Sequence, residues 1–154
     1  MDPALVEQVA RAAVAAHRGE RGPLLPVLHT VAHELGYVPE QAVPVIAQEL
    51  NLSRADVHGV ISFYSDFRRE PAGRVVVQVC QAEACQAVGA RELMDGVAAR
   101  LAVAPGTTRE DRAVTLDEIF CFGNCALGPA ATVDGTLHGR LDTDRLTSLV
   151  QDAL

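Results

Sequence analysis

The sequence contains no lysine and no tryptophan, and only 4% of its 154 residues are aromatic. All 13 basic residues are arginines, against 20 aspartates and glutamates, which gives a formal net charge of −7. An acidic chain without a dense basic cluster lacks the electrostatic character of a nucleic-acid-binding protein. The sequence also has no nucleophile elbow and no glycine-rich phosphate loop, so it does not match the common hydrolase and nucleotide-binding motifs.

Long apolar runs are missing too. No segment reaches the roughly 20 predominantly apolar residues that a membrane-spanning helix needs. The chain begins MDPALVEQ, without the basic stretch and apolar run of a secretory signal peptide. With 49% apolar and 21% charged residues, the composition is that of an ordinary globular protein of one domain or two small ones. We therefore expect a cytoplasmic protein without membrane insertion.

Cysteine is scarce, and the four cysteines form two short-spaced pairs. Cys80 and Cys85 make a C-x4-C motif, and Cys121 and Cys125 make a C-x3-C motif after a gap of 35 residues. Cytosolic thiols are kept reduced, so clustered cysteines there are more often metal-binding or catalytic than disulfide-bonded. Two loops with two thiolates each complete a four-thiolate shell, which suits either an iron–sulfur cluster or zinc.

The spacing favours a 2Fe-2S cluster over zinc. Zinc fingers and ribbons mostly use tighter C-x2-C turns, whereas C-x4-C resembles the first half of the plant-type ferredoxin pattern. Gly123, between the second pair of cysteines, has no Cβ, so the backbone there can approach sulfur closely or adopt a positive φ, and N–H groups can then point at the thiolates. A zinc-stabilised interaction module is the alternative, and redox thiols are a third interpretation that the absence of C-x-x-C disfavours.

Charge near the cysteines predicts a low reduction potential. Glu83 lies inside the first cysteine loop, and neither loop contains an arginine. Reduction adds a negative charge to a cluster that is already anionic, and a nearby carboxylate opposes that change. His29 and His33 are spaced i, i+4 on one helix, but no third ligand accompanies them, so we do not expect them to bind metal.

Helical periodicity dominates the first 69 residues. The apolar spacing predicts four helices, at about residues 3–16, 23–35, 40–51 and 53–67. Ser53 and Asp56 match a capping box at the start of the fourth helix, whose apolar stripe runs to Phe67. Four short helices with short connections indicate a small helical bundle.

From residue 70 the pattern changes to strands and helices. The run GRVVVQVC predicts a buried strand that ends at Cys80, followed by a helix at about 87–102. AVTLDEIF predicts a second strand leading into Cys121, and Asp134-Gly135 predicts a hairpin turn before a final helix. The order β, α, β, β, β, α indicates an α/β layer arrangement in which both cysteine loops leave the carboxyl ends of strands.

Several motifs of the chain belong together. They are C-x4-C, C-x-G-x-C and the ALGPA that follows it, and the helical stretches LPVLHTVAHELGYVPEQAV and LSRADVHGVISFYSDF. Together these motifs resemble the thioredoxin-like 2Fe-2S subunit family, which includes the 24 kDa-type subunit of complex I. The resemblance covers nearly the whole chain. It implies an α+β fold, with an N-terminal helical bundle at 1–69 followed by a thioredoxin-like α/β domain with a mixed sheet at 70–154.

The same resemblance implies that Cys80, Cys85, Cys121 and Cys125 bind one 2Fe-2S cluster. Phe122 stands where leucine is common in the family, a departure that changes no ligand. Within the family, CQAEACQAVGA and HGVISFYSDFR are most similar to the gamma subunit of NAD-dependent molybdenum formate dehydrogenases.

That closer similarity implies an electron-transfer subunit without an active site of its own. A protein of this kind exchanges single electrons with a partner subunit that carries FMN, an NAD site and further clusters. A larger subunit containing the molybdenum cofactor oxidises formate. The equivalent subunit of complex I or of an NAD-reducing hydrogenase is the alternative identity.

Overall fold

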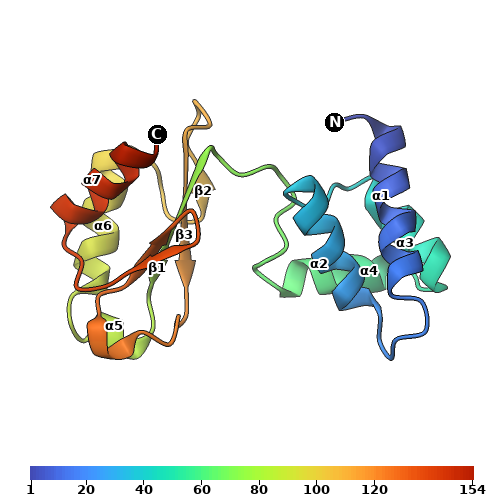
Figure 1. Cartoon of the computed structure of the whole chain (residues 1–154), viewed down its shortest axis with the longest axis horizontal. Helices are drawn as coiled ribbons and strands as arrows, with labels where there is room; N and C mark the ends of the chain where they lie inside the picture. Colours follow the sequence, from blue (N-terminus) through green and yellow to red (C-terminus); the bar gives the residue numbers. More distant parts are fainter. The chain divides into compact units, whose positions relative to one another are not determined.

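The computed structural model describes all 154 residues, and their contacts divide the chain into two compact units, Met1–Pro71 and Ala72–Leu154 (Figure 1). Each unit has a buried apolar core of its own. The expected domain boundary, with residues 1–69 in one domain and 70–154 in the other, remains a prediction. None of the helices is both long and apolar enough to cross a membrane.

The first unit is a bundle of four helices. These are α1 (Pro3–Ala16), α2 (Leu24–Leu35), α3 (Ala42–Leu50) and α4 (Arg54–Phe63). Apolar side chains from all four helices share one core, and Phe67 adds to it from beyond the end of α4. The predicted helices are confirmed, but α4 ends at Phe63, earlier than expected, because Tyr64 adopts extended backbone angles (φ −94°, ψ 116°).

The predicted capping box at the start of α4 is present. The Ser53 hydroxyl accepts a hydrogen bond from the Asp56 N–H at 3.0 Å, and the Asp56 carboxylate accepts one from the Ser53 N–H at 3.1 Å. We expect Ser53→Ala to lower the free energy of unfolding of this unit by about 0.5–2 kcal/mol, because helix N–H groups lose their partner. Urea unfolding followed by circular dichroism measures this loss. Ser65→Ala, outside the helices, is the control and should change stability little.

The second unit is built on a five-stranded sheet. Its elements in chain order are β1 (Val75–Cys80), α5 (Glu83–Gln86), α6 (Ala90–Leu101), β2 (Thr107–Thr108), β3 (Val114–Ile119), η1 (Cys125–Leu127), β4 (Ala131–Val133), β5 (Thr136–His138) and α7 (Thr143–Ala153). The strand order is β2-β3-β1-β4-β5. Only β1 and β3 pair in parallel, and the other neighbours are antiparallel, so the sheet is mixed as predicted.

Helices α6 and α7 cover one face of this sheet (Figure 1). Val75, Val77 and Val79 of β1 are buried in the core that these helices complete. At the intervening position between Val77 and Val79, the Gln78 side chain accepts a hydrogen bond from Thr132 of the neighbouring strand β4. This alternation fixes the register of β1, since a shift by one residue would move the valines out of the core.

The hairpin predicted at Asp134-Gly135 is confirmed. Both residues have positive φ angles, 47° and 78°, as a type I′ turn between two antiparallel strands requires. Three short elements were not expected from the sequence, the two-residue strand β2, the single-turn helix α5 and the 3-10 turn η1. The helix expected at 87–102 begins only at Ala90, because Gly89 has a φ of 98° that helical backbone does not allow.

Candidate metal centre

The two cysteine pairs are brought to one edge of the sheet by neighbouring parallel strands. Cys80 is the last residue of β1 and is in register with Ile119, the last residue of β3. Cys121 follows β3 after one intervening residue, and Cys125 opens the single 3-10 turn η1. Adjacent parallel strands end at the same edge, so the expectation that both loops leave carboxyl ends of strands is confirmed.

Within each cysteine pair the two thiols lie close together. The Sγ atoms of Cys121 and Cys125 lie 3.6 Å apart. The Cys85 thiol hydrogen-bonds with Cys80, whereas Cys125 of the other loop interacts with both of them only electrostatically. All four are free thiols; Cys80 and Cys85 are each 2% exposed, whereas the other two are exposed to solvent. The centre therefore has one buried half and one open half.

Backbone N–H groups point at the sulfurs. The Gly123 N–H donates to Cys121 Sγ at 3.3 Å, and Gly123 has a positive φ of 80°, one of the two roles expected for a glycine there. The Cys80 sulfur interacts with the N–H of Ala82 in its own loop and with the N–H groups of Cys121 and Phe122 in the other loop. Such donors stabilise negative charge on sulfur. They also show that the second loop closes over a ligand of the first.

These surroundings shift the thiol pKa values in different directions. Burial tends to raise the pKa of Cys80, but the N–H groups and the Cys85 thiol outweigh it, so this pKa lies below its ordinary value. Burial raises the pKa of Cys85, and its contact with Cys80 adds to the shift, against the opposing N–H of Ala130. The thiol of Cys121 raises the pKa of Cys125. Of the two buried thiols, Cys80 is the one more readily ionised.

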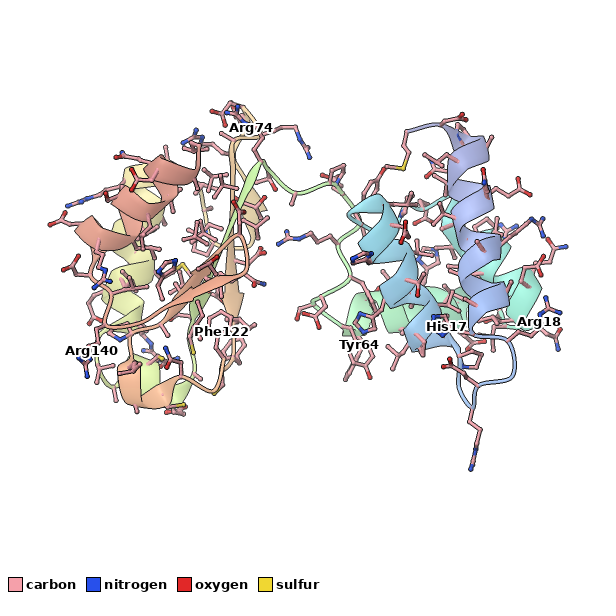
Figure 2. All side chains as sticks on the ribbon, in the orientation of Figure 1. His17, Arg18, Tyr64, Arg74, Phe122 and Arg140 are labelled. Carbon is pink, nitrogen blue, oxygen red and sulfur yellow. The ribbon has the colours of Figure 1, made fainter.

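A small apolar shell surrounds the buried half of the centre. Cys80 and Cys85 form a buried cluster with Ala90 and Ala130, and three half-buried residues pack against it, namely Ala82, Ile119 and Phe122. Phe122 is labelled in Figure 2, near the end of the second unit where the cysteine loops lie. The chain also passes close to Cys85 at Gly128, where an added Cβ would lie 3.3 Å from the Cys85 Sγ.

Four residues that shape the centre were not expected from the sequence. Gln81 and Gln86 hydrogen-bond across the first loop, and Gly128 and Gly139 allow close approaches around η1. One signal for the glutamines was available, because each cysteine of the first loop is followed directly by glutamine. The role of the two glycines depends on tertiary contacts and had no comparable signal.

The histidines have other contacts. The His29 ring packs against Phe67 with centroids 4.8 Å apart, and His33 Nδ1 lies 3.5 Å from the Glu34 carboxylate. No group of three or more His, Cys, Asp or Glu side chains is arranged to hold a single metal ion.

A family model and individual relatives both match this chain over most of its length. The model of the thioredoxin-like [2Fe-2S] ferredoxin family matches residues 10–154. The NADH-quinone oxidoreductase of Pseudomonas aeruginosa has a subunit, lettered E, that is 32% identical over 131 residues, which cover 85% of this chain and 79% of that protein. A corresponding NADH-quinone oxidoreductase subunit from Rhizobium meliloti is 32% identical over 140 residues, which cover 91% of this chain and 83% of its own length.

A solved structure shares the fold. An NAD+-reducing [NiFe]-hydrogenase in the air-oxidised state superposes with a TM-score of 0.70 and 25% sequence identity over 84% of this chain. The match spans only 22% of the hydrogenase chain, about a fifth of its length. The family model covers nearly all of the sequence, including both cysteine loops. The chain therefore belongs to the thioredoxin-like 2Fe-2S ferredoxin family, as its motifs predicted.

Proposed function

We propose that the chain is an electron-transfer subunit that holds one 2Fe-2S cluster between Cys80, Cys85, Cys121 and Cys125. One observation carries the proposal: the two thiols of each loop lie close together, the pairs interact electrostatically, and N–H groups of the second loop hydrogen-bond to a sulfur of the first. Four thiolates with N–H donors are the ligand set that such clusters use. The bound cluster supplies a site that takes up and releases one electron at a time.

The chain's own residues hold and shield this site. Strands β1 and β3 set the separation of the two loops. The buried cysteines and the alanines around them exclude water from the inner side. The exposed Cys121 and Cys125 leave the outer side open to a redox partner. We assign no bond-making step to the chain itself.

The finer assignment is to an NAD-dependent molybdenum formate dehydrogenase. The stretches CQAEACQAVGA and HGVISFYSDFR support it. The partners would then be a subunit that binds FMN and NAD and a catalytic subunit with the molybdenum cofactor. We propose a cytoplasmic location, since metal-binding cysteine clusters are typical of that reducing compartment. The relatives in NADH-quinone oxidoreductases and the similar hydrogenase structure favour complex I or an NAD-reducing hydrogenase as the second candidate.

Anaerobic purification of the tagged chain from its own host tests the finer assignment. We expect the complex to reduce NAD+ with formate and to contain molybdenum. Hydrogen-dependent reduction of NAD+ with nickel present, or oxidation of NADH by a quinone, would instead assign the chain to one of the alternative complexes. Each of the three activities is measurable in the same preparation.

Glu83 provides a test of the predicted low reduction potential. This carboxylate is exposed within the first cysteine loop. We expect Glu83→Gln to raise the potential by up to about 40 mV, since an exposed charge at close range contributes about 1 kcal/mol. A redox titration followed by EPR measures the shift. Glu110→Gln, in the exposed turn at the opposite end of β3, is the matched control and should leave the potential unchanged.

A further inference from the structure

Gln81 is a buried polar residue directly beside a cysteine. Its exposed fraction is 7%, and it is one of few polar side chains buried in the chain. Burying an amide is unfavourable unless its polar atoms have hydrogen-bond partners. The Gln81 side chain meets this requirement by donating from Nε2 to the carbonyl oxygen of Ala90 at 2.9 Å. That hydrogen bond ties the exit of β1 to the first residue of α6.

Gln86 makes a second connection across the same loop. Its Nε2 donates to the backbone carbonyl oxygen of Gln81 at 2.6 Å. The Gln81 N–H is itself held by the carbonyl oxygen of Ile119 in β3, at 2.8 Å. Gln81 is therefore fixed to the sheet through its backbone N–H. It also takes part in both side-chain hydrogen bonds, as the donor to Ala90 and as the acceptor from Gln86.

These connections enclose Cys85 and begin directly after Cys80. Cys85 lies within the two hydrogen-bonded rings that the glutamines close, one over residues 81–86 and one over residues 81–90. Cys80 directly precedes both rings, and its N–H donates to the carbonyl oxygen of Ala130. Helix α5 has only four residues, and such a short helix is not stable by itself. The position of Cys85 relative to Cys80 thus depends on contacts outside α5.

We propose that Gln81 and Gln86 are positioning residues that fix the separation and orientation of the Cys80 and Cys85 thiolates for the cluster. This inference rests on the proposed function, because it concerns how the first loop presents its two ligands. The side-chain amides are neutral, so they position the ligands without adding charge to the centre. Neither glutamine is a ligand of the proposed cluster. Each acts on it only through the position of a cysteine.

The test uses the full chain purified anaerobically, as wild type and as the Gln81→Met and Gln86→Met variants. Methionine keeps the length and approximate volume of glutamine but cannot donate a hydrogen bond. We expect both variants to bind a cluster but to release iron to a chelator about five to ten times faster than the wild type. The EPR spectrum of the dithionite-reduced protein should also shift its g values, since the geometry at two of the four thiolates changes.

Gln78→Met is the matched control. Gln78 lies in β1, two residues before Cys80. The substitution removes its side-chain hydrogen bond with Thr132, which joins two strands and does not cross the cysteine loop. This variant should keep the iron-release rate and the EPR spectrum of the wild type. Far-UV circular dichroism and the urea unfolding midpoint show whether each variant is folded. Gln86→Met, at a half-buried site, is the milder of the two substitutions.

The outcomes separate this inference from the proposed function. Wild-type EPR spectra and iron-release rates in both variants would overturn the positioning role while the cluster assignment stands. A lower unfolding midpoint with an unchanged EPR spectrum would also overturn it, because that result is purely structural. A wild-type chain that binds no cluster after reconstitution would overturn the proposed function first, and the inference with it.

Discussion

Replacing Cys85 with serine is expected to remove the stable cluster from the chain. A serine alcohol ionises far less readily than a thiol, so it is a poor substitute for a thiolate ligand. Cys85 is also 2% exposed, packed against alanines and close to Gly128, so solvent has little access to replace the lost ligand. We expect the iron content to fall from about two per chain to well below one, or the visible spectrum to change.

The same measurement applies to the other three ligand positions. Serine at Cys80, Cys121 or Cys125 should also lower the iron content or shift the spectrum. His29→Ala is the control, because His29 lies in the first unit with its ring against Phe67 and should leave both properties unchanged. Full retention of iron with a wild-type spectrum in the Cys85→Ser protein would contradict the ligand assignment.

Gly139→Ala is expected to destabilise the second cysteine loop. An added Cβ at this position would lie 2.7 Å from the carbonyl oxygen of Leu127 and 2.9 Å from its Cβ. The adjacent Arg140 N–H donates to that same carbonyl oxygen at 2.7 Å, so the segment after β5 supports the turn that begins at Cys125. Relief of the clash must move backbone, because the nearest atom is not at the end of a flexible side chain.

We expect this substitution to lower the free energy of unfolding by about 1–3 kcal/mol, the usual cost of forcing a methyl group into a packed site. Urea unfolding of the metal-free chain measures the loss. The cluster-loaded protein should also release iron faster, because η1 carries Cys125.

Gly59→Ala is the control for this prediction. Gly59 lies inside α4, and no atom is within 4 Å of an added Cβ. It should stabilise the chain by about 0.5–1 kcal/mol, since alanine favours helix over glycine. Wild-type stability and iron retention in Gly139→Ala would show that the segment after β5 does not support the second loop.

Features encoded by neighbouring residues could be predicted from the sequence. The β-branched run ending at Cys80 forms a strand because alternate valines fill the core under α6 and α7. Ser53 and Asp56 cap α4 through contacts three residues apart. Asp134-Gly135 forms its hairpin because both residues adopt positive φ angles. In each case the determining interaction spans only a few residues, and the sequence pattern contains it.

Features set by distant contacts could not be predicted in the same way. The end of α4 at Phe63 depends on Tyr64 leaving the helix while Phe67 still reaches the core. Strand β2 has two residues, too few for a recognisable period, and exists through pairing with β3. The approach of Gly139 to Leu127 joins segments that the sequence separates by a hairpin. The four cysteines are visible in the sequence, but the N–H groups around them are positioned by the fold.

The central claim is that this chain holds a redox-active 2Fe-2S cluster, and a visible absorption spectrum with iron and zinc analysis of the anaerobically purified protein tests it most directly. We predict a brown protein with about two irons per chain, bleached by dithionite and then giving a rhombic EPR signal. A colourless protein with about one zinc and no iron, even after attempted cluster reconstitution, would contradict the claim. That result would make a zinc-stabilised interaction module the better account of the four cysteines.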